Sequence, residues 1–191
     1  LTTAGVALID DVSATSLATG ASLELTDSAQ WDIFDAANAG VTNDNDLRVG
    51  VQGFGSLSVL TDSDVAAEEI SVGLGNGGTG LINVDGAGST LTATRTTTAG
   101  GILVFGDAGG TGTVTITNGG QLLTANTGGS ANQDIVVGRG FFDADPGDPV
   151  NPVVRSNGTL TVSGAGSLAE TSDLLEGHLG GVGTLNVLDA G

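Results

Sequence analysis

The chain has 191 residues, with four Lys or Arg against 22 Asp or Glu, so its formal net charge is −18. A field of this sign repels phosphate backbones and anionic lipid surfaces, and it attracts cations such as Ca²⁺ or a more basic partner. The charge therefore excludes an electrostatic nucleic-acid binder. Thirty-four glycines and an aromatic content of only 3% leave small aliphatic side chains to build the core.

Hydrophobic residues make up 39% of the chain and recur along its whole length, which predicts a folded protein despite the charge. The absence of cysteine excludes disulfides, thiolate nucleophiles and thiolate metal sites. No apolar run approaches 18 residues and no basic-then-apolar leader opens the sequence, so neither a membrane span nor a signal peptide is expected.

The first recurring element is a four-residue phrase of the form apolar-x-apolar-Gly. It reads LRVG, ISVG, LVFG and IVVG, with a degenerate fifth copy, LLEG. The glycines that close it are Gly50, Gly73, Gly106, Gly138 and Gly177, which are 23, 33, 32 and 39 residues apart. A recurring unit of about 25–33 residues with two or three short strands is typical of a coiled β-solenoid.

A second phrase follows each first phrase and alternates polar with apolar residues. It reads GSLSV, GTVTI, GTLTV and GTLNV, with a looser copy GLINV. The alternation directs Leu160 and Val162 to the core and Thr159 and Thr161 to water, and Leu185 and Val187 repeat the core pattern in the last copy. Glycine-rich corners such as GAGS and NGG supply the positive φ angles between strands. The pattern predicts an all-β fold, a parallel β-helix (β-solenoid) of about six coils, with residues 1–191 as a single domain.

The combined pattern, VG-x-x-G-x-GTLTV-x-x-GG alternating with GAGS corners, resembles the passenger repeats of autotransporter-type adhesins, large surface β-solenoids of Gram-negative bacteria. The resemblance covers about residues 20–191. It implies a right-handed, three-sided coil and a secreted, extracellular location at the cell surface. The chain is then expected to be a slice of a longer repeat array or fibre, whose ends either stack on other copies end to end or continue in the same chain.

Residues 141–156 interrupt the repeat and contain all three prolines, which predicts an inserted Pro/Asp-rich loop. Asp143, Asp145 and Asp148 have the spacing that opens an oxygen-ligand Ca²⁺ loop, although the position of its bidentate acid falls on Val154. A solvated acidic loop is the alternative. The sequence requires no cofactor, and Ca²⁺ is its candidate ligand.

Two aromatic residues open the same insertion. Phe141 and Phe142 are candidate contacts for a partner or a glycan. The alternative is a clamp that closes the loop onto the solenoid wall.

Two residues depart from the repeat near its end. Glu176 occupies the position of Val49, Val72, Phe105 and Val137, and an unpaired carboxylate in the core would be costly, so a local register change or a bulge is expected there. His178 is the only histidine, and its place beside Gly177 favours a bystander over a catalytic or metal-binding residue.

Enzymes that degrade polysaccharides also use β-solenoids, and paired carboxylates one coil apart would suit glycosidase chemistry. Against an enzyme, the chain has no Lys, few aromatic residues for sugar stacking and no cluster of Arg with Asp expected at one corner. The sequence therefore favours a non-catalytic structural or adhesive segment. The alternatives are a carbohydrate- or host-surface-binding module acting through residues 141–156 and, less favoured, a polysaccharide-degrading enzyme.

Overall fold

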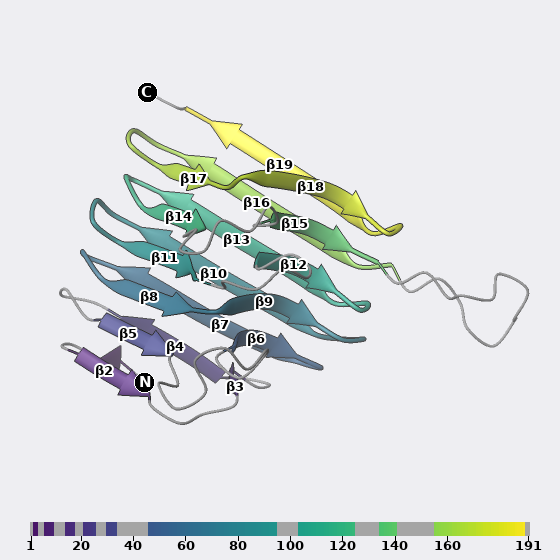
Figure 1. Ribbon diagram of the computed structural model, residues 1–191, viewed down its shortest axis with the longest axis horizontal. Helices are drawn as coiled ribbons and strands as arrows, with labels where there is room; N and C mark the ends of the chain where they lie inside the picture. The colour runs from purple at the N-terminus through teal and green to yellow at the C-terminus, as the bar shows by residue number, and fades with distance from the viewer. Residues whose placement is uncertain are drawn as a thin grey trace, which may run out of the picture.

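The computed structural model describes residues 46–94, 103–124, 134–140 and 155–189, together with the strands at 2–3, 6–9, 14–17, 21–25 and 30–33. The described residues form only β-strands, turns and bends, with no helix among them. The strands build three parallel sheets of seven, six and six strands, named A, B and C below (Figure 1).

Sheet A contains β1 (Thr2–Thr3), β4 (Ala21–Leu25), β7 (Phe54–Leu60), β10 (Thr79–Asp85), β13 (Thr111–Thr117), β16 (Asn157–Ser163) and β19 (Val182–Leu188). Sheet B contains β2 (Val6–Ile9), β5 (Gln30–Ile33), β8 (Asp64–Ala67), β11 (Thr90–Ala93), β14 (Gln121–Thr124) and β17 (Leu168–Glu170). Sheet C contains β3 (Ala14–Leu17), β6 (Asp46–Val51), β9 (Glu69–Leu74), β12 (Leu103–Asp107), β15 (Asp134–Arg139) and β18 (Asp173–His178).

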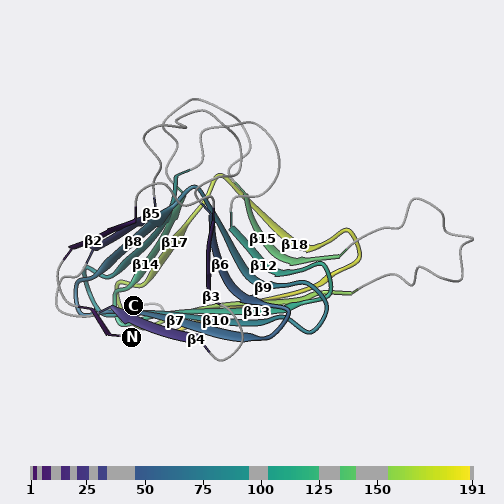
Figure 2. The same ribbon diagram turned by 90° about the horizontal axis from the view of Figure 1, so that it is seen from below.

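Neighbours within each sheet are three strands apart in the chain, so the polypeptide visits the sheets in turn and adds one strand to each. One such set of three consecutive strands, from sheets B, C and A, is called a layer below. Figure 2 looks along the stack of layers, and the strands of each sheet overlie one another. This arrangement is consistent with a parallel β-helix and confirms the all-β, parallel-strand prediction.

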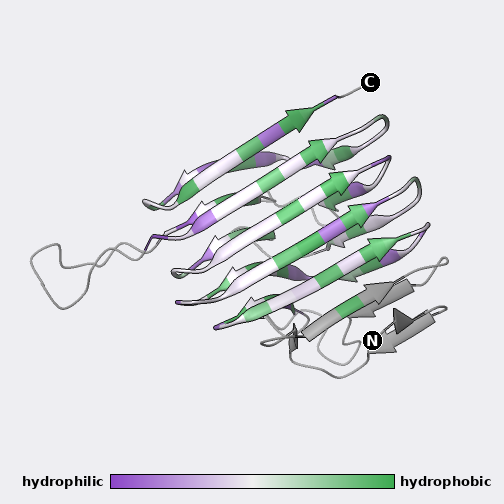
Figure 3. Cartoon of the chain, turned by 180° about the vertical axis from the view of Figure 1, so that it is seen from behind, coloured by the Kyte–Doolittle hydropathy of each residue, from purple (hydrophilic) through white to green (hydrophobic). Residues whose placement is uncertain are grey.

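The core consists of aliphatic side chains stacked in register from layer to layer. Leu57, Ile82, Val114 and Leu160 are register partners along sheet A, and all four are buried. The polar residues between them stay on the other face, so the apolar positions form bands across the strands in Figure 3. The alternation predicted from the second phrase is therefore confirmed for Leu160, and Val162 packs against the core.

Glycines of the two phrases lie where sheets C and A come closest. Gly106, which closes LVFG, has φ +72, and a Cβ there would lie 2.1 Å from the carbonyl oxygen of Asn157. Gly112, which opens GTVTI, has space for no side chain either, because its Cβ would lie 2.1 Å from the carbonyl oxygen of Val72. The recurring glycines are therefore required by contacts between backbones as well as by turn geometry.

Serine side chains tie the GAGS corners to the preceding layer. The Ser89 hydroxyl donates to the carbonyl of Asp85 (2.9 Å) and accepts from the backbone N–H of Asp62 (3.2 Å). Ser167 repeats this pattern with the carbonyl of Ser163 (2.6 Å) and the N–H of Gly119 (3.1 Å). Each hydroxyl thus satisfies two backbone groups at the corner, a carbonyl of its own layer and an N–H of the layer below.

Within the part of the chain that the structure describes, no helix has the length and apolar character needed to cross a bilayer.

The glycine contacts yield a stability prediction. Gly112→Ala should lower the free energy of unfolding by about 3 kcal/mol or more, because the methyl group must displace backbone atoms. Gly77→Ala is the matched control: it has φ +84 but nothing within 4 Å of an added Cβ, so only the left-handed backbone cost of about 1–2 kcal/mol applies. Urea unfolding followed by circular dichroism compares them, and equal losses would contradict the packing explanation.

Candidate functional site

An ion pair lies at the corner where sheet C ends, formed by Asp107 at the end of β12 and Arg139 at the end of β15. The parallel register places the two residues opposite each other. Arg139 donates from Nε to Oδ1 of Asp107 (3.0 Å) and from a terminal guanidinium nitrogen to Oδ2 (2.5 Å). Asp107 is only 4% exposed. The guanidinium thus holds a nearly buried carboxylate through two parallel hydrogen bonds.

The electrostatics of this pair favour the charged form of Arg139. The hydrogen bond with Asp107 raises the pKa of Arg139 above its ordinary value, against the opposing effect of burial, and the charges of Asp107 and Glu69 add to the increase. Arg139 therefore stays protonated throughout the pH range in which the protein would be studied.

The pair corrects the expectation that no Arg and Asp cluster at one corner. Asp107 and Arg139 are 32 residues apart in the sequence, and the parallel stacking of β12 on β15 brings them together. A signal was present, because each residue directly follows the glycine of a first phrase, and equivalent positions stack in a β-solenoid. Arg48 also pairs with Asp46, at 2.8 Å within the same strand.

The residue before the predicted insertion, Gly140, and the last residue of the insertion, Ser156, are both anchored to the stack. Gly140 donates its N–H to the carbonyl of His178 (2.9 Å). At the other end, the hydroxyl of the buried Ser156 accepts from the N–H of Gly109 (2.9 Å), and its carbonyl accepts from the N–H of Val182 (2.8 Å). The candidate residues of the insertion, Phe141, Phe142, Asp143, Asp145 and Asp148, lie outside the described residues.

His178 lies at the same corner, in register with Arg139. Its carbonyl accepts hydrogen bonds from Gly140 and Gly181, so its backbone contributes to the turn. Across the described ranges, no three His, Cys, Asp or Glu side chains gather closely enough to hold a metal ion.

Glu176 keeps the register of its strand, so the predicted bulge or register change is wrong. It pairs with Val137 in the ladder between β15 and β18, and its neighbours Leu174 and Leu175 pair in step. The Cγ of Glu176 lies 2.3 Å from the position that a Cβ on Gly183 would take, just as a Cγ of Val72 lies beside Gly80 three layers below. The side chain is nevertheless exposed, because β18 is the last strand of sheet C, so the carboxylate reaches water.

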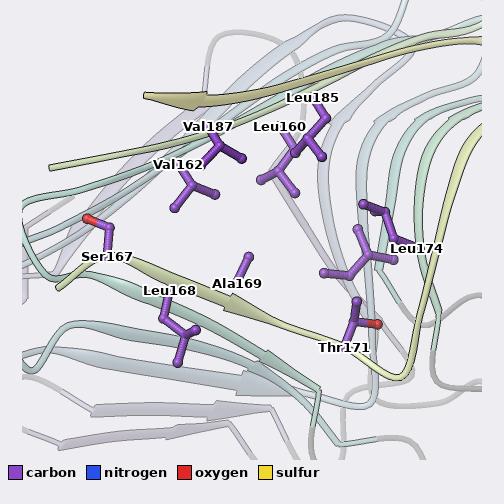
Figure 4. A pocket seen from close by; sticks show the side chains of 10 residues that line it. Leu160, Val162, Ser167, Leu168, Ala169, Thr171, Leu174, Leu185 and Val187 are labelled. Atoms are coloured by element: carbon purple, nitrogen blue, oxygen red, sulfur yellow. The ribbon is translucent and has the colours of Figure 1, made fainter. Parts of the chain in front are cut away.

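An apolar pocket opens at the same end of the stack, with a volume of about 250 Å³. Leu160 and Val162 of β16 and Leu185 and Val187 of β19 face Ala169 of β17 across it, and Leu174 of β18 lies on a third side (Figure 4). Val187 is 60% exposed and Leu174 42%, whereas Ile135, the partner of Leu174 one layer below, is buried. The core is therefore open to solvent at this end, which accounts for the exposure of Leu185 and Val187 against their predicted burial.

No protein-family model, curated protein or solved structure matches this chain.

The ion pair yields a second stability prediction. Arg139→Gln should cost about 2–3 kcal/mol of unfolding free energy, because it leaves the Asp107 carboxylate nearly buried without its cation. Arg155→Gln removes the same charge from an exposed side chain and should cost under about 0.5 kcal/mol. Chemical denaturation measures both, and an Arg139 variant as stable as the Arg155 variant would show that the pair contributes nothing.

Proposed function

We propose that this chain is a non-catalytic, extracellular structural or adhesive β-solenoid that forms part of a cell-surface fibre, stalk or adhesin. The proposal follows the resemblance to autotransporter-type passenger repeats. One observation carries it: strands of successive layers pair in register in all three sheets, and glycines with no space for a side chain interlock them. Such packing suits a rigid spacer, because each layer supports the next along one axis.

The finer architecture belongs to the same proposal. A three-sided coil is supported by the strand order, in which neighbours in every sheet are three strands apart, and by the view along the stack in Figure 2. The seven- and six-stranded sheets support about six coils. The right hand of the coil and the surface location rest on the resemblance alone.

The surface chemistry agrees with an exposed, soluble rod. Polar residues such as Thr113, Thr115, Thr159 and Thr161 line the outer face of sheet A, and the net charge of −18 keeps such rods apart.

Ca²⁺ is proposed as an optional ion bound by Asp143, Asp145 and Asp148. Titration calorimetry with Ca²⁺ tests this proposal by comparing the unmodified chain with a variant in which all three Asp residues are replaced by Asn.

The structural role predicts where the protein is found and what it does not do. Antibodies against the folded chain should label thin projections on intact cells of the source organism in immunogold electron microscopy. The purified chain should release no reducing ends or unsaturated sugars from a panel of acidic polysaccharides. Labelling confined to the cell interior would contradict the location, and turnover lost on replacing one carboxylate would establish the enzyme instead.

A binding module acting through residues 141–156 is the second candidate. It is favoured by the anchoring of both ends, where Arg139 bonds Asp107 and the buried Ser156 bonds Gly109 and Val182. Anchored ends would present an insertion at a defined place on the rod, as binding loops on rigid scaffolds are presented.

If residues 141–156 form the binding module, replacing this loop should abolish binding but leave the stability of the fold nearly unchanged. Replacing residues 141–154 by a short Gly-Ser linker should change the free energy of unfolding by no more than about 1 kcal/mol, because loop-closure entropy depends weakly on length. If the loop carries the contact, the same variant should lose binding to glycans or host cells that the parent chain binds. Unchanged binding by a folded loop-deleted chain would remove this candidate.

A further inference from the structure

Three Asn-Gly dipeptides occur in the chain, and the structure places them in three different environments. Their asparagines are Asn76, Asn118 and Asn157. An asparagine followed by glycine is chemically labile, because no Cβ on the glycine hinders its backbone nitrogen from attacking the asparagine side chain. All three asparagines are exposed to solvent, so exposure alone does not distinguish them. The three sites differ in how firmly the side chain and the following N–H are held.

Asn76 and Gly77 are the central residues of the turn that joins β9 to β10 (Figure 1). The turn is closed by the N–H of Gly78, which donates to the carbonyl of Gly75 (2.9 Å). The angle φ is positive at Gly77 (+84) but not at Asn76, which is the pattern of a type II turn. Among the described residues, no hydrogen bond holds the side-chain amide of Asn76 or the N–H of Gly77. A Cβ on Gly77 would have no atom within 4 Å, so the peptide unit between the two residues can rotate without displacing a neighbour.

The same dipeptide is restrained in the turn between β13 and β14. Asn118 donates from Nδ2 to Oδ1 of Asp85 (2.7 Å). Gly119 donates its N–H to the hydroxyl of Ser167 (3.1 Å). The side chain that would be attacked and the nitrogen that would attack it are therefore both bonded to residues of the neighbouring corners.

The third dipeptide lies in a strand rather than in a turn. Asn157 begins β16 and pairs in register with Thr111 of β13 and Val182 of β19. Its own N–H donates to the carbonyl of Gly110 (3.0 Å). In a paired strand the side chain projects from the sheet while the following N–H lies in the plane of the sheet, so an attack would require the strand to open.

We propose that Asn76 is a site of spontaneous deamidation in the folded protein, and that the folded structure protects Asn118 and Asn157. The backbone nitrogen of Gly77 loses its proton to hydroxide and attacks Cγ of Asn76, which forms a new C–N bond. The side-chain nitrogen takes up a proton and leaves as ammonia. Water then opens the cyclic imide at either carbonyl and gives aspartate or isoaspartate. The net reaction consumes one water and releases one ammonia, without an oxidant or a reductant.

The product would alter a corner that is tied to its neighbours on both sides of the dipeptide. Gly75 donates its N–H to the carbonyl of Asp107 (3.0 Å), and the carbonyl of Gly78 accepts from the N–H of Thr111 (2.8 Å). Isoaspartate lengthens the main chain by one carbon between these two contacts, and either product adds a negative charge to a chain that already carries −18. The converted fraction therefore increases with the age of the folded molecule, whether or not the chain has the structural role proposed above.

Mass spectrometry of the intact, folded chain tests this proposal. Cleavage after the four arginines places the three asparagines on different tryptic peptides, residues 49–95, 96–139 and 156–191. The 191-residue chain is incubated in mildly alkaline buffer, and fragmentation of each peptide locates and quantifies the conversion of amide to acid. Asn76 should convert roughly tenfold or more faster than Asn118, because two hydrogen bonds must first open at Asn118. In guanidinium chloride, which unfolds the chain, the three sites should convert at similar rates.

Two substitutions test the protection of Asn118. Asp85→Ala removes the acceptor of its side chain, and Ser167→Ala removes the acceptor of the following N–H. Each should increase the conversion rate of Asn118 by roughly threefold or more. Thr124→Ala is the matched control, because it removes a different hydrogen bond between β14 and β17 (3.2 Å), and it should leave that rate unchanged. Asn157 in the same samples reports any general loosening, and circular dichroism confirms that each variant is folded.

Three outcomes would overturn the proposal. Equal conversion of Asn76 and Asn118 in the folded chain would show that their hydrogen bonds make no difference. A difference of the same size in the folded and the unfolded chain would assign it to the local sequence. Conversion of Asn76 in the unfolded chain but not in the folded chain would show that the turn prevents the attack. None of these readouts depends on cell-surface labelling or polysaccharide turnover, so the proposed function can fail separately.

Discussion

The close approach of backbone to backbone at the junction of sheets C and A is the constraint on which the structure depends. Gly106 and Gly112 leave no space for a Cβ because carbonyl groups of adjacent layers occupy it. That approach sets the register between neighbouring layers. The register in turn aligns the aliphatic columns, such as Leu57, Ile82 and Val114, that exclude water from the interior. The hydrophobic core is therefore a consequence of glycine placement as much as of apolar composition.

Most of the fold could be predicted from the sequence because every layer repeats the same local requirements. Each first-phrase glycine marks the end of a sheet C strand, and each second phrase lies on a sheet A strand. Sheet B was harder to predict, since its strands are as short as Leu168–Glu170 and carry no recurring glycine phrase. The periodicity of the sequence reflects the backbone geometry of the strands. This signal is weakest where a strand is short and its side chains vary from layer to layer.

The candidate site was predicted less well, for two physical reasons. The pairing of Asp107 with Arg139 depends on stacking across layers, which becomes visible only when the phrases are aligned position by position. Glu176 was expected to disturb its strand, yet main-chain pairing holds the register, since the carboxylate reaches solvent at the open end. Whether a charged residue is tolerated in a column of buried side chains thus depends on whether another layer covers that residue. The sequence of a single strand does not show this.

The nearest-neighbour connectivity also determines how the molecule responds to force. Within each sheet every strand pairs only with strands one layer away, so tension along the chain can detach one layer without breaking the pairing of the layers beyond it. A released layer extends by roughly 3.4 Å per residue while the layers behind it remain bonded. Stretching therefore proceeds as a series of small ruptures that dissipate work, and a stack of layers built in this way lengthens under load before it breaks.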